Sequence, residues 1–196
     1  MAPRANSEKR YRRILDAWNA PEGAGRPIAC VASTFTFDAV FFEEECLSRF
    51  LRLDTNPSQD GIAYLIEREE KLAEARVSVL VDRRHVSPLR SLRWDLLPVR
   101  VPGAAQHSKV SVLVWERALR LMVASANLTE PGYCLNREVF GVLDYQSGRE
   151  APREVAEDAL AFLRGVVESA VAGELVVEGP RKRALEAIED ATRRLS

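Results

Sequence analysis

Three polar side chains in the second half of the chain have the types and spacing of a phosphate-binding site. His107 and Lys109 are two residues apart, and Asn127 follows an apolar segment further along. If His107 and Lys109 open a strand, their side chains project on the same face, because strand side chains alternate. An imidazole, a fixed ammonium and an amide donor in one place suit an anion with several oxygen atoms, above all a phosphodiester.

A predicted hairpin brings these groups together. Residues 107–115 and 119–127 read as two strands joined by a tight turn, so they should lie antiparallel and adjacent. That pairing places the Ser125 hydroxyl and the Asn127 amide close to His107. We therefore expect one compact site at the start of the first strand and the end of the second.

A carboxylate and an aromatic ring are the other candidates. Glu138 could hold the second ring nitrogen of His107 and so set the tautomer of the imidazole. Tyr133 lies in the loop after Asn127, where an aromatic ring could stack on a base. The predicted catalytic group is listed as His107, Lys109, Asn127 and Glu138, with Ser125 and Tyr133 binding substrate.

The elements that must position this group predict an α/β fold. Apolar runs at 28–35, 77–82 and 109–115 indicate central strands covered on both faces. Two helices, over 152–172 and 180–195, close the chain. Strands and helices alternate before them, so we predict a mixed sheet with helices packed on both of its faces.

Local signals predict further elements. Asp38 is placed to cap a helix over 39–51. Pro98 cannot donate to a strand ladder, so the strand around it should lie at a sheet edge. The segment from Ile62 reads either as one helix or as a short strand followed by a helix. A short helix over 8–18 is also predicted.

The domain organisation is predicted to be simple. Residues 1–27 form an N-terminal helix and loop, and residues 28–196 form one domain, with its C-terminal helices from about 152.

Composition excludes several classes of protein. The chain has 196 residues, is 46% hydrophobic and 29% charged, and has a net charge of -1, which excludes a disordered tail, a fibre and a disulfide scaffold. No run of 18 apolar residues predicts a membrane span, and no secretory signal is visible. Cys30, Cys46 and Cys134 lack metal-ligand spacing and fit a reducing cytoplasm. We expect no cofactor and no metal, and any polyanion contact must be local.

The spacing of the polar residues resembles the signature of the phospholipase D superfamily, His-x-Lys, Ser-x-Asn and Asn-x-Glu. The matching segments are His107-x-Lys109, Ala124-Ser125-x-Asn127 and Asn136-x-Glu138. The segment 125–133 is similar to the nuclease and DNA-repair branches. Val114 stands where many members have Asp. The separation of Lys109 and Asn127 along the sequence is also longer than in the commonest lipase form. Both features resemble the tyrosyl-DNA phosphodiesterase branch and favour a nucleic-acid substrate over a lipid.

The resemblance implies a phosphodiesterase that needs no metal. One histidine attacks phosphorus and forms a covalent phosphohistidine, and a second histidine protonates the leaving oxygen and later activates water. Lysine and asparagine side chains hold the non-bridging oxygens.

This chain supplies only one such motif. Its other histidine, His85, is interpreted as a solvated loop residue, with phosphate contact from Arg83, Arg84 and His85 as the second interpretation. The second motif would come from a homodimer mate or from a missing C-terminal half. A non-catalytic half-domain that binds phosphate or nucleic acid is the alternative function, and a phospholipid hydrolase is the third.

Overall fold

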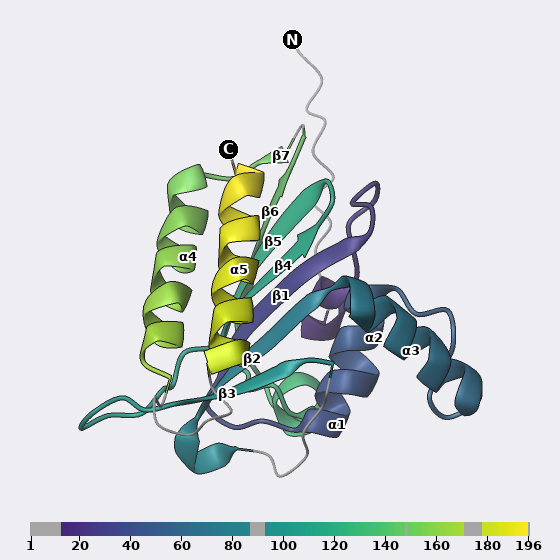
Figure 1. Cartoon of the computed structure of the whole chain (residues 1–196), viewed down its shortest axis with the longest axis horizontal. Helices are drawn as coiled ribbons and strands as arrows, with labels where there is room; N and C mark the ends of the chain where they lie inside the picture. Colours follow the sequence, from purple (N-terminus) through teal and green to yellow (C-terminus); the bar gives the residue numbers. More distant parts are fainter. Residues whose placement is uncertain (1–12, 87–92, 148, 171–177, 196) are drawn as a thin grey trace.

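The computed structural model describes residues 13–86, 93–147, 149–170 and 178–195, and Figure 1 shows the arrangement of the elements. The described strands form a seven-stranded sheet in the order β3-β2-β1-β4-β5-β6-β7. β1, β2 and β3 are parallel, and each later strand pairs antiparallel with its neighbour, starting with β4 on β1. This mixed sheet confirms the predicted α/β fold class.

The elements occur in the predicted order, but β4 and β6 begin later and β5 ends earlier than the sequence predicts. The strands are Pro27–Thr34 (β1), Arg76–Asp82 (β2), Asp95–Val99 (β3), Val110–Trp115 (β4), Ala118–Ala124 (β5), Phe140–Gln146 (β6) and Arg149–Glu150 (β7). The α-helices are Ala39–Phe41 (α1), Ser48–Leu51 (α2), Ile62–Glu74 (α3), Arg153–Glu168 (α4) and Glu178–Leu195 (α5). The shorter helical turns are Ile14–Trp18 (η1), Phe42–Leu47 (η2), Arg83–His85 (η3) and Pro131–Leu135 (η4).

Alternate residues of the central strands face two separate cores. In β1, Ala29 and Val31 pack in the core under α4 and α5, whereas Cys30 and Ala32 pack in the core that contains α1, η2 and α2. Figure 1 shows α4 and α5 on one face of the sheet and α1, α2 and α3 on the opposite face. Because both faces are covered, the central strands are apolar throughout, which is the pattern that predicted them.

Several local predictions are confirmed and others need correction. Pro98 lies in β3 at the sheet edge, and the segment from Ile62 forms one helix, α3. The strand predicted over 107–115 is shorter, because β4 begins only at Val110. His107 and Lys109 therefore precede the strand. Most of the helix predicted over 8–18 lies outside the described residues.

The predicted helix over 39–51 occurs, but it contains a π turn. Asp38 caps it by accepting hydrogen bonds from the backbone nitrogens of Val40 at 3.0 Å and Phe41 at 3.1 Å. The turn η2 then separates α1 from α2. Such turns are rare in helices and are frequently found at functional sites.

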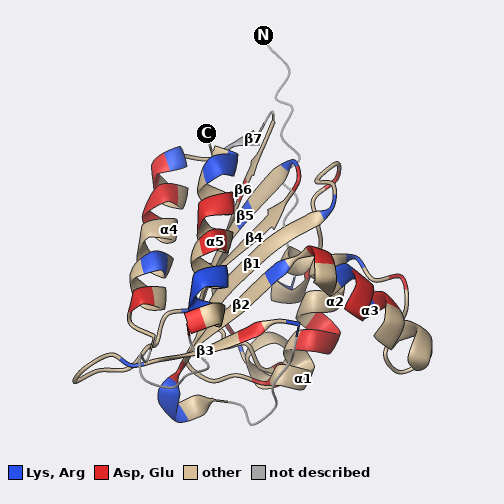
Figure 2. Ribbon diagram, in the orientation of Figure 1, with Lys and Arg blue, Asp and Glu red and all other residues tan. Residues whose placement is uncertain are grey.

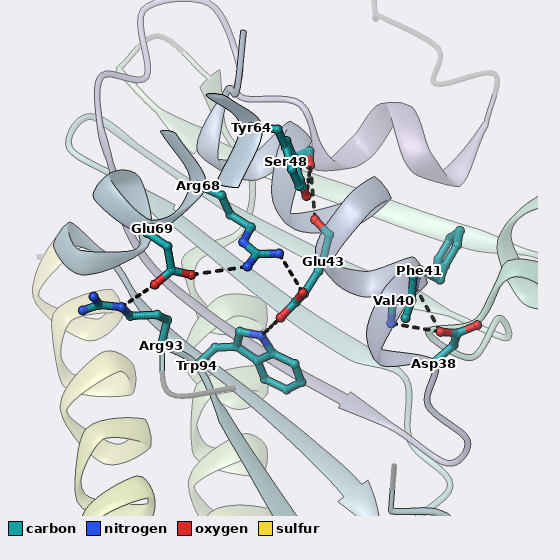
Figure 3. Close-up of polar contacts among 10 residues, drawn as sticks. All are labelled: Asp38, Val40, Phe41, Glu43, Ser48, Tyr64, Arg68, Glu69, Arg93 and Trp94. Carbon is teal, nitrogen blue, oxygen red and sulfur yellow. Dashed lines mark hydrogen bonds and ion pairs between the residues drawn. The ribbon is translucent and has the colours of Figure 1, made fainter. Parts of the chain in front are cut away.

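Glu43 in η2 ties this helical segment to α3 and to the chain before β3. Its carboxylate accepts hydrogen bonds from Arg68 Nη1 at 3.0 Å and from Trp94 Nε1 at 2.7 Å. Glu69 extends the network by accepting from Arg68 and from Arg93 (Figure 3). This network fixes the helical layer on the sheet face opposite α4 and α5.

Removing Arg120 tests how the N-terminal segment is anchored. Arg120 is 1% exposed, and its guanidinium donates to the Asp144 carboxylate and to the carbonyl oxygens of Ala17 and Asn19. We expect Arg120→Met to lower the free energy of unfolding by about 3–5 kcal/mol, because Asp144 and two carbonyls lose a charged donor. Urea unfolding measures the change.

The matched control is Arg153→Met, which breaks an exposed pair with Glu157 on α4. Exposed pairs contribute less than about 1 kcal/mol. An Arg120→Met protein no less stable than this control would contradict the anchoring role.

Candidate active site

The candidate catalytic residues gather at one end of the central strands. We call this end of the sheet the site edge, as distinct from the edge strand β3. β1, β2 and β5 end there and β4 and β6 begin there, because β4 and β6 run opposite to β1. In open α/β sheets, ligands bind in the crevice outside the carboxyl ends of strands. The side chains at the site edge are Phe35, Asp82, Arg84, His85, His107, Lys109, Asn127 and Glu138.

His107 and Lys109 are in direct contact. Lys109 Nζ lies 3.2 Å from Nδ1 and 3.4 Å from Nε2 of His107, and it donates to the His107 carbonyl oxygen at 2.9 Å. His107 is exposed, whereas Lys109 is only 9% exposed. The structure thus brings these two side chains together in the segment just before β4.

Lys109 is a buried residue with a charged side chain. Among the residues that the structure describes, no carboxylate lies within ion-pair distance of its Nζ. Burial lowers the pKa of Lys109 below the ordinary value of 10.5, and the charge of Glu138 opposes this shift. Because an unpaired buried charge is costly, an anion bound beside Lys109 would be stabilised.

Asp82, at the end of β2, holds the segment that carries His107. Its buried carboxylate accepts hydrogen bonds from the backbone and guanidinium of Arg84 and, at 3.0 Å, from the Gln106 backbone nitrogen. Gln106 Oε1 accepts from Ser108 N at 3.2 Å and Oγ at 2.9 Å. The hydrogen bonds from Arg84, above all, hold the pKa of Asp82 well below its ordinary value. Sequence reasoning missed Asp82, although a carboxylate ending an apolar strand was a visible signal.

Asn127 is oriented by backbone donors. Its Oδ1 accepts hydrogen bonds from Phe35 N at 3.2 Å, Thr36 N at 3.4 Å and Thr34 Oγ1 at 3.4 Å. Within the described ranges no group accepts from its Nδ2, so this donor is available to a ligand. Gly132 permits the arrangement, since a Cβ there would lie 2.5 Å from the Asn127 carbonyl oxygen. The role of Gly132 was not predicted.

Glu138 does not hold the His107 ring, contrary to the prediction. Its carboxylate accepts hydrogen bonds from Ser125 Oγ and, at 3.4 Å, from Asn136 Nδ2. The physical reason is strand pairing, because Ser125 and Val139 continue the β5–β6 ladder, with Ser125 N donating to Val139 O at 2.9 Å. Ser125 therefore donates a hydrogen bond to Glu138. The negative charge of Glu138 raises the pKa of Lys109, against the effect of burial.

The Tyr133 side chain packs into the core. Its ring packs edge-on against Phe41, with centroids 5.5 Å apart, and its hydroxyl accepts a hydrogen bond from Trp18 Nε1 at 3.3 Å. Burial raises the pKa of this hydroxyl well above its ordinary value. The ring packs against the core that contains α1, so the structure does not support the predicted stacking on a base.

Phe35, just after β1, contacts both histidines of the chain. Its ring centroid lies 4.3 Å from that of His85 and 4.8 Å from that of His107. The Arg84 guanidinium carbon and Lys109 Nζ lie 5.8 Å and 6.0 Å from the same centroid. His85 is exposed, as predicted, but the structure also brings it to the site edge, where the phosphate contact given as its second interpretation would place it.

The cations at the site edge are important for binding an anion, because the rest of the surface carries both positive and negative charges. Figure 2 shows Lys and Arg interspersed with Asp and Glu along α3, α4 and α5. The net charge of the chain is -1. Attraction of an anion must therefore come from local groups such as Lys109.

Comparison with solved structures identifies the fold. No family model and no curated protein matches the sequence. The crystal structure of yeast tyrosyl-DNA phosphodiesterase matches with a TM-score of 0.52 over 88% of this chain, at 11% sequence identity. The chain has the fold of the matched part of this enzyme. Two structures of substituted forms of the yeast enzyme match with the same TM-score, at 11% and 12% identity, over 88% and 89% of this chain.

The likeness covers part of the yeast enzyme. The chain spans 37% of its length in that crystal structure and 36% in the two substituted forms. The match confirms the predicted phospholipase D-like α/β fold.

Replacing Asp82 by asparagine should loosen the segment before β4. We expect Asp82→Asn to lower the free energy of unfolding by about 1.5–3 kcal/mol near neutral pH, the usual contribution of hydrogen bonds to a charged group. The folded-state pKa of Asp82 is depressed. Its contribution is therefore complete above the unfolded-state pKa of about 3.9 and is lost as the pH falls below that value.

Urea unfolding at about pH 7 and about pH 3 checks the direction. The gap between the original protein and Asp82→Asn should narrow at the lower pH. Asp54→Asn, at an exposed carboxylate, is the control and should show no gap. A gap of equal size at both pH values would show that the charge of Asp82 is not what stabilises the segment.

Proposed function

We propose that this protein is a metal-independent phosphodiesterase of phospholipase D type that acts on nucleic acid through a covalent phosphohistidine on His107. The observation that carries the proposal is the buried Lys109 ammonium, which contacts the His107 imidazole and has no ion-pair partner among the described residues. The fold shared with a phosphodiesterase supports the same class of reaction.

The geometry suits attack on phosphorus by His107. A neutral ring nitrogen of His107 forms the N–P bond while the bond from phosphorus to the leaving oxygen breaks. Lys109 Nζ and Asn127 Nδ2 donate to the non-bridging oxygens, where negative charge builds in the transition state. Glu138 is a positioning residue that fixes Ser125 and favours the charged form of Lys109.

The reaction needs a second imidazole to protonate the leaving oxygen and later to take a proton from water. The single His-x-Lys motif implies two sources for it. One is His107 of an identical partner chain in a homodimer, and the other is a second motif in a longer polypeptide.

A nucleic-acid substrate is favoured over a lipid. Val114 occupies the position at which many phospholipase D relatives have Asp, and the fold is that of a tyrosyl-DNA phosphodiesterase. No helix in the described part of the chain is long and apolar enough to cross a bilayer. The free thiols Cys30, Cys46 and Cys134 are consistent with the proposed cytoplasmic location.

Substitution at His107 and Lys109 tests the proposal. We expect His107→Ala to reduce cleavage of a labelled oligonucleotide by about 10³-fold or more, because the nucleophile is lost. Lys109→Met should reduce it by about 10²–10³-fold, because a donor to the developing charge is lost. Lys71→Met is the control, since Lys71 pairs with Glu67 on α3. Cleavage should persist in EDTA, and denaturation during turnover should trap labelled phosphate on the original protein but not on His107→Ala.

Two results would contradict this function. One is cleavage that survives in His107→Ala, and the other is cleavage that EDTA abolishes. Tight binding of the oligonucleotide without turnover would instead favour the non-catalytic half-domain, and hydrolysis of phosphatidylcholine alone would favour the lipid hydrolase.

The lowered pKa of Lys109 predicts an alkaline limit to activity. Because Lys109 must be protonated to hold phosphate oxygens, kcat/KM should fall as the pH rises, at a pH below the ordinary lysine value of 10.5. Arginine stays protonated throughout this range. The alkaline fall should therefore be absent in Lys109→Arg, whatever its overall rate, and an unchanged fall would assign it to another group.

A further inference from the structure

We propose that His85 supplies the second imidazole of the site from within the same chain, protonating the leaving oxygen while His107 attacks phosphorus. This inference rests on the phosphodiesterase function proposed above. It names a source for the second imidazole other than the partner chain or the second motif considered above. Both histidines of the reaction would then come from the described residues of one chain.

The sheet order carries the inference. β1 lies between β2 and β4. His85 ends the turn η3 after β2, Phe35 follows β1, and His107 precedes β4. Neighbouring strands are about 4.7–4.9 Å apart, so groups on β2 and β4 are about 9–10 Å apart. The chain's two histidines, 22 positions apart in the sequence, thus stand at neighbouring positions on either side of Phe35.

The ring contacts agree with that spacing. The centroids of His85 and His107 lie 4.3 Å and 4.8 Å from the Phe35 centroid, so the two imidazoles are at most 9.1 Å apart, the sum of these distances. In-line attack needs an attacking nitrogen about 3–3.5 Å from phosphorus. It also needs an acid about 2.6–3.2 Å from the leaving oxygen. The upper limit of 9.1 Å is compatible with one phosphodiester group that contacts both imidazoles beside the Phe35 ring.

Each imidazole also has a cation beside the same ring. Lys109 accompanies His107, and Arg84 accompanies His85, with both cations about 6 Å from the Phe35 centroid. Asp82 fixes Arg84 because its carboxylate accepts two hydrogen bonds from the guanidinium, at 2.7 Å and 3.0 Å. Two imidazoles and two cations therefore surround the Phe35 ring, where a phosphate could contact them.

The two half-reactions balance in atoms and protons. In the first, a nitrogen of His107 bonds to phosphorus, the bond to the leaving oxygen breaks, and that oxygen takes the proton of the His85 imidazolium. In the second, neutral His85 takes a proton from water as the water oxygen bonds to phosphorus. The N–P bond then breaks, its electron pair returns to His107, and one water has been consumed.

Two substrates with different leaving groups test the role of His85. An oligonucleotide has an alkoxide leaving group that needs a proton, whereas a p-nitrophenyl phosphodiester releases a phenolate that does not. We expect His85→Ala to reduce oligonucleotide cleavage by about 10²–10⁴-fold and p-nitrophenyl ester cleavage by less than about 10-fold. His85→Phe keeps a ring against Phe35 but cannot donate a proton to the leaving oxygen. It should therefore also lose oligonucleotide cleavage and keep most of the p-nitrophenyl ester cleavage.

The outcomes separate this inference from the function on which it rests. Unchanged oligonucleotide cleavage in His85→Ala, equal losses on both substrates, or full activity in His85→Phe would overturn the role of His85. In each of these cases the loss of activity in His107→Ala would still support the phosphodiesterase. An original protein that cleaves neither substrate would overturn the function itself, and the role of His85 with it.

Discussion

A lysine ammonium withdrawn from water and left without a carboxylate partner among the described residues is the constraint on which the site depends. Lys109 is itself buried, and its ammonium donates a hydrogen bond to the His107 carbonyl oxygen. Such a charge costs folding free energy. In return, the ammonium is already desolvated and oriented when an anion arrives, which is the condition under which electrostatic stabilisation is strongest.

The place of this cation follows from the topology of the sheet. β1 pairs in parallel with β2 and antiparallel with β4. The end of β1 therefore lies between the end of one strand and the beginning of another. Three connecting segments meet there, and Phe35 is in the middle of them. The carboxyl ends of strands in open α/β sheets are a common place for ligands to bind.

Residues without a proposed chemical role hold the site in shape. Asp82 joins the turn after β2 to the segment before β4. Ser33 accepts a hydrogen bond from the Val110 backbone nitrogen at 3.0 Å and lies 2.9 Å from the Ser108 hydroxyl. Gly132 lets η4 approach Asn127. These contacts span distant parts of the chain, so the precision of the site depends on the whole β2–β1–β4–β5 unit.

The sequence by itself indicated the main strands and helices, and it indicated which residue types could carry the chemistry. Apolar runs indicated the central strands, Asp38 the start of a helix and Pro98 an edge strand, because these depend on local sterics and hydrogen bonding. Only the tertiary structure decided which side chains meet. It directed Tyr133 towards the core, paired Glu138 with Ser125 and brought His85 to Phe35. Strand order, register and loop paths set these neighbours, and no local pattern encodes them.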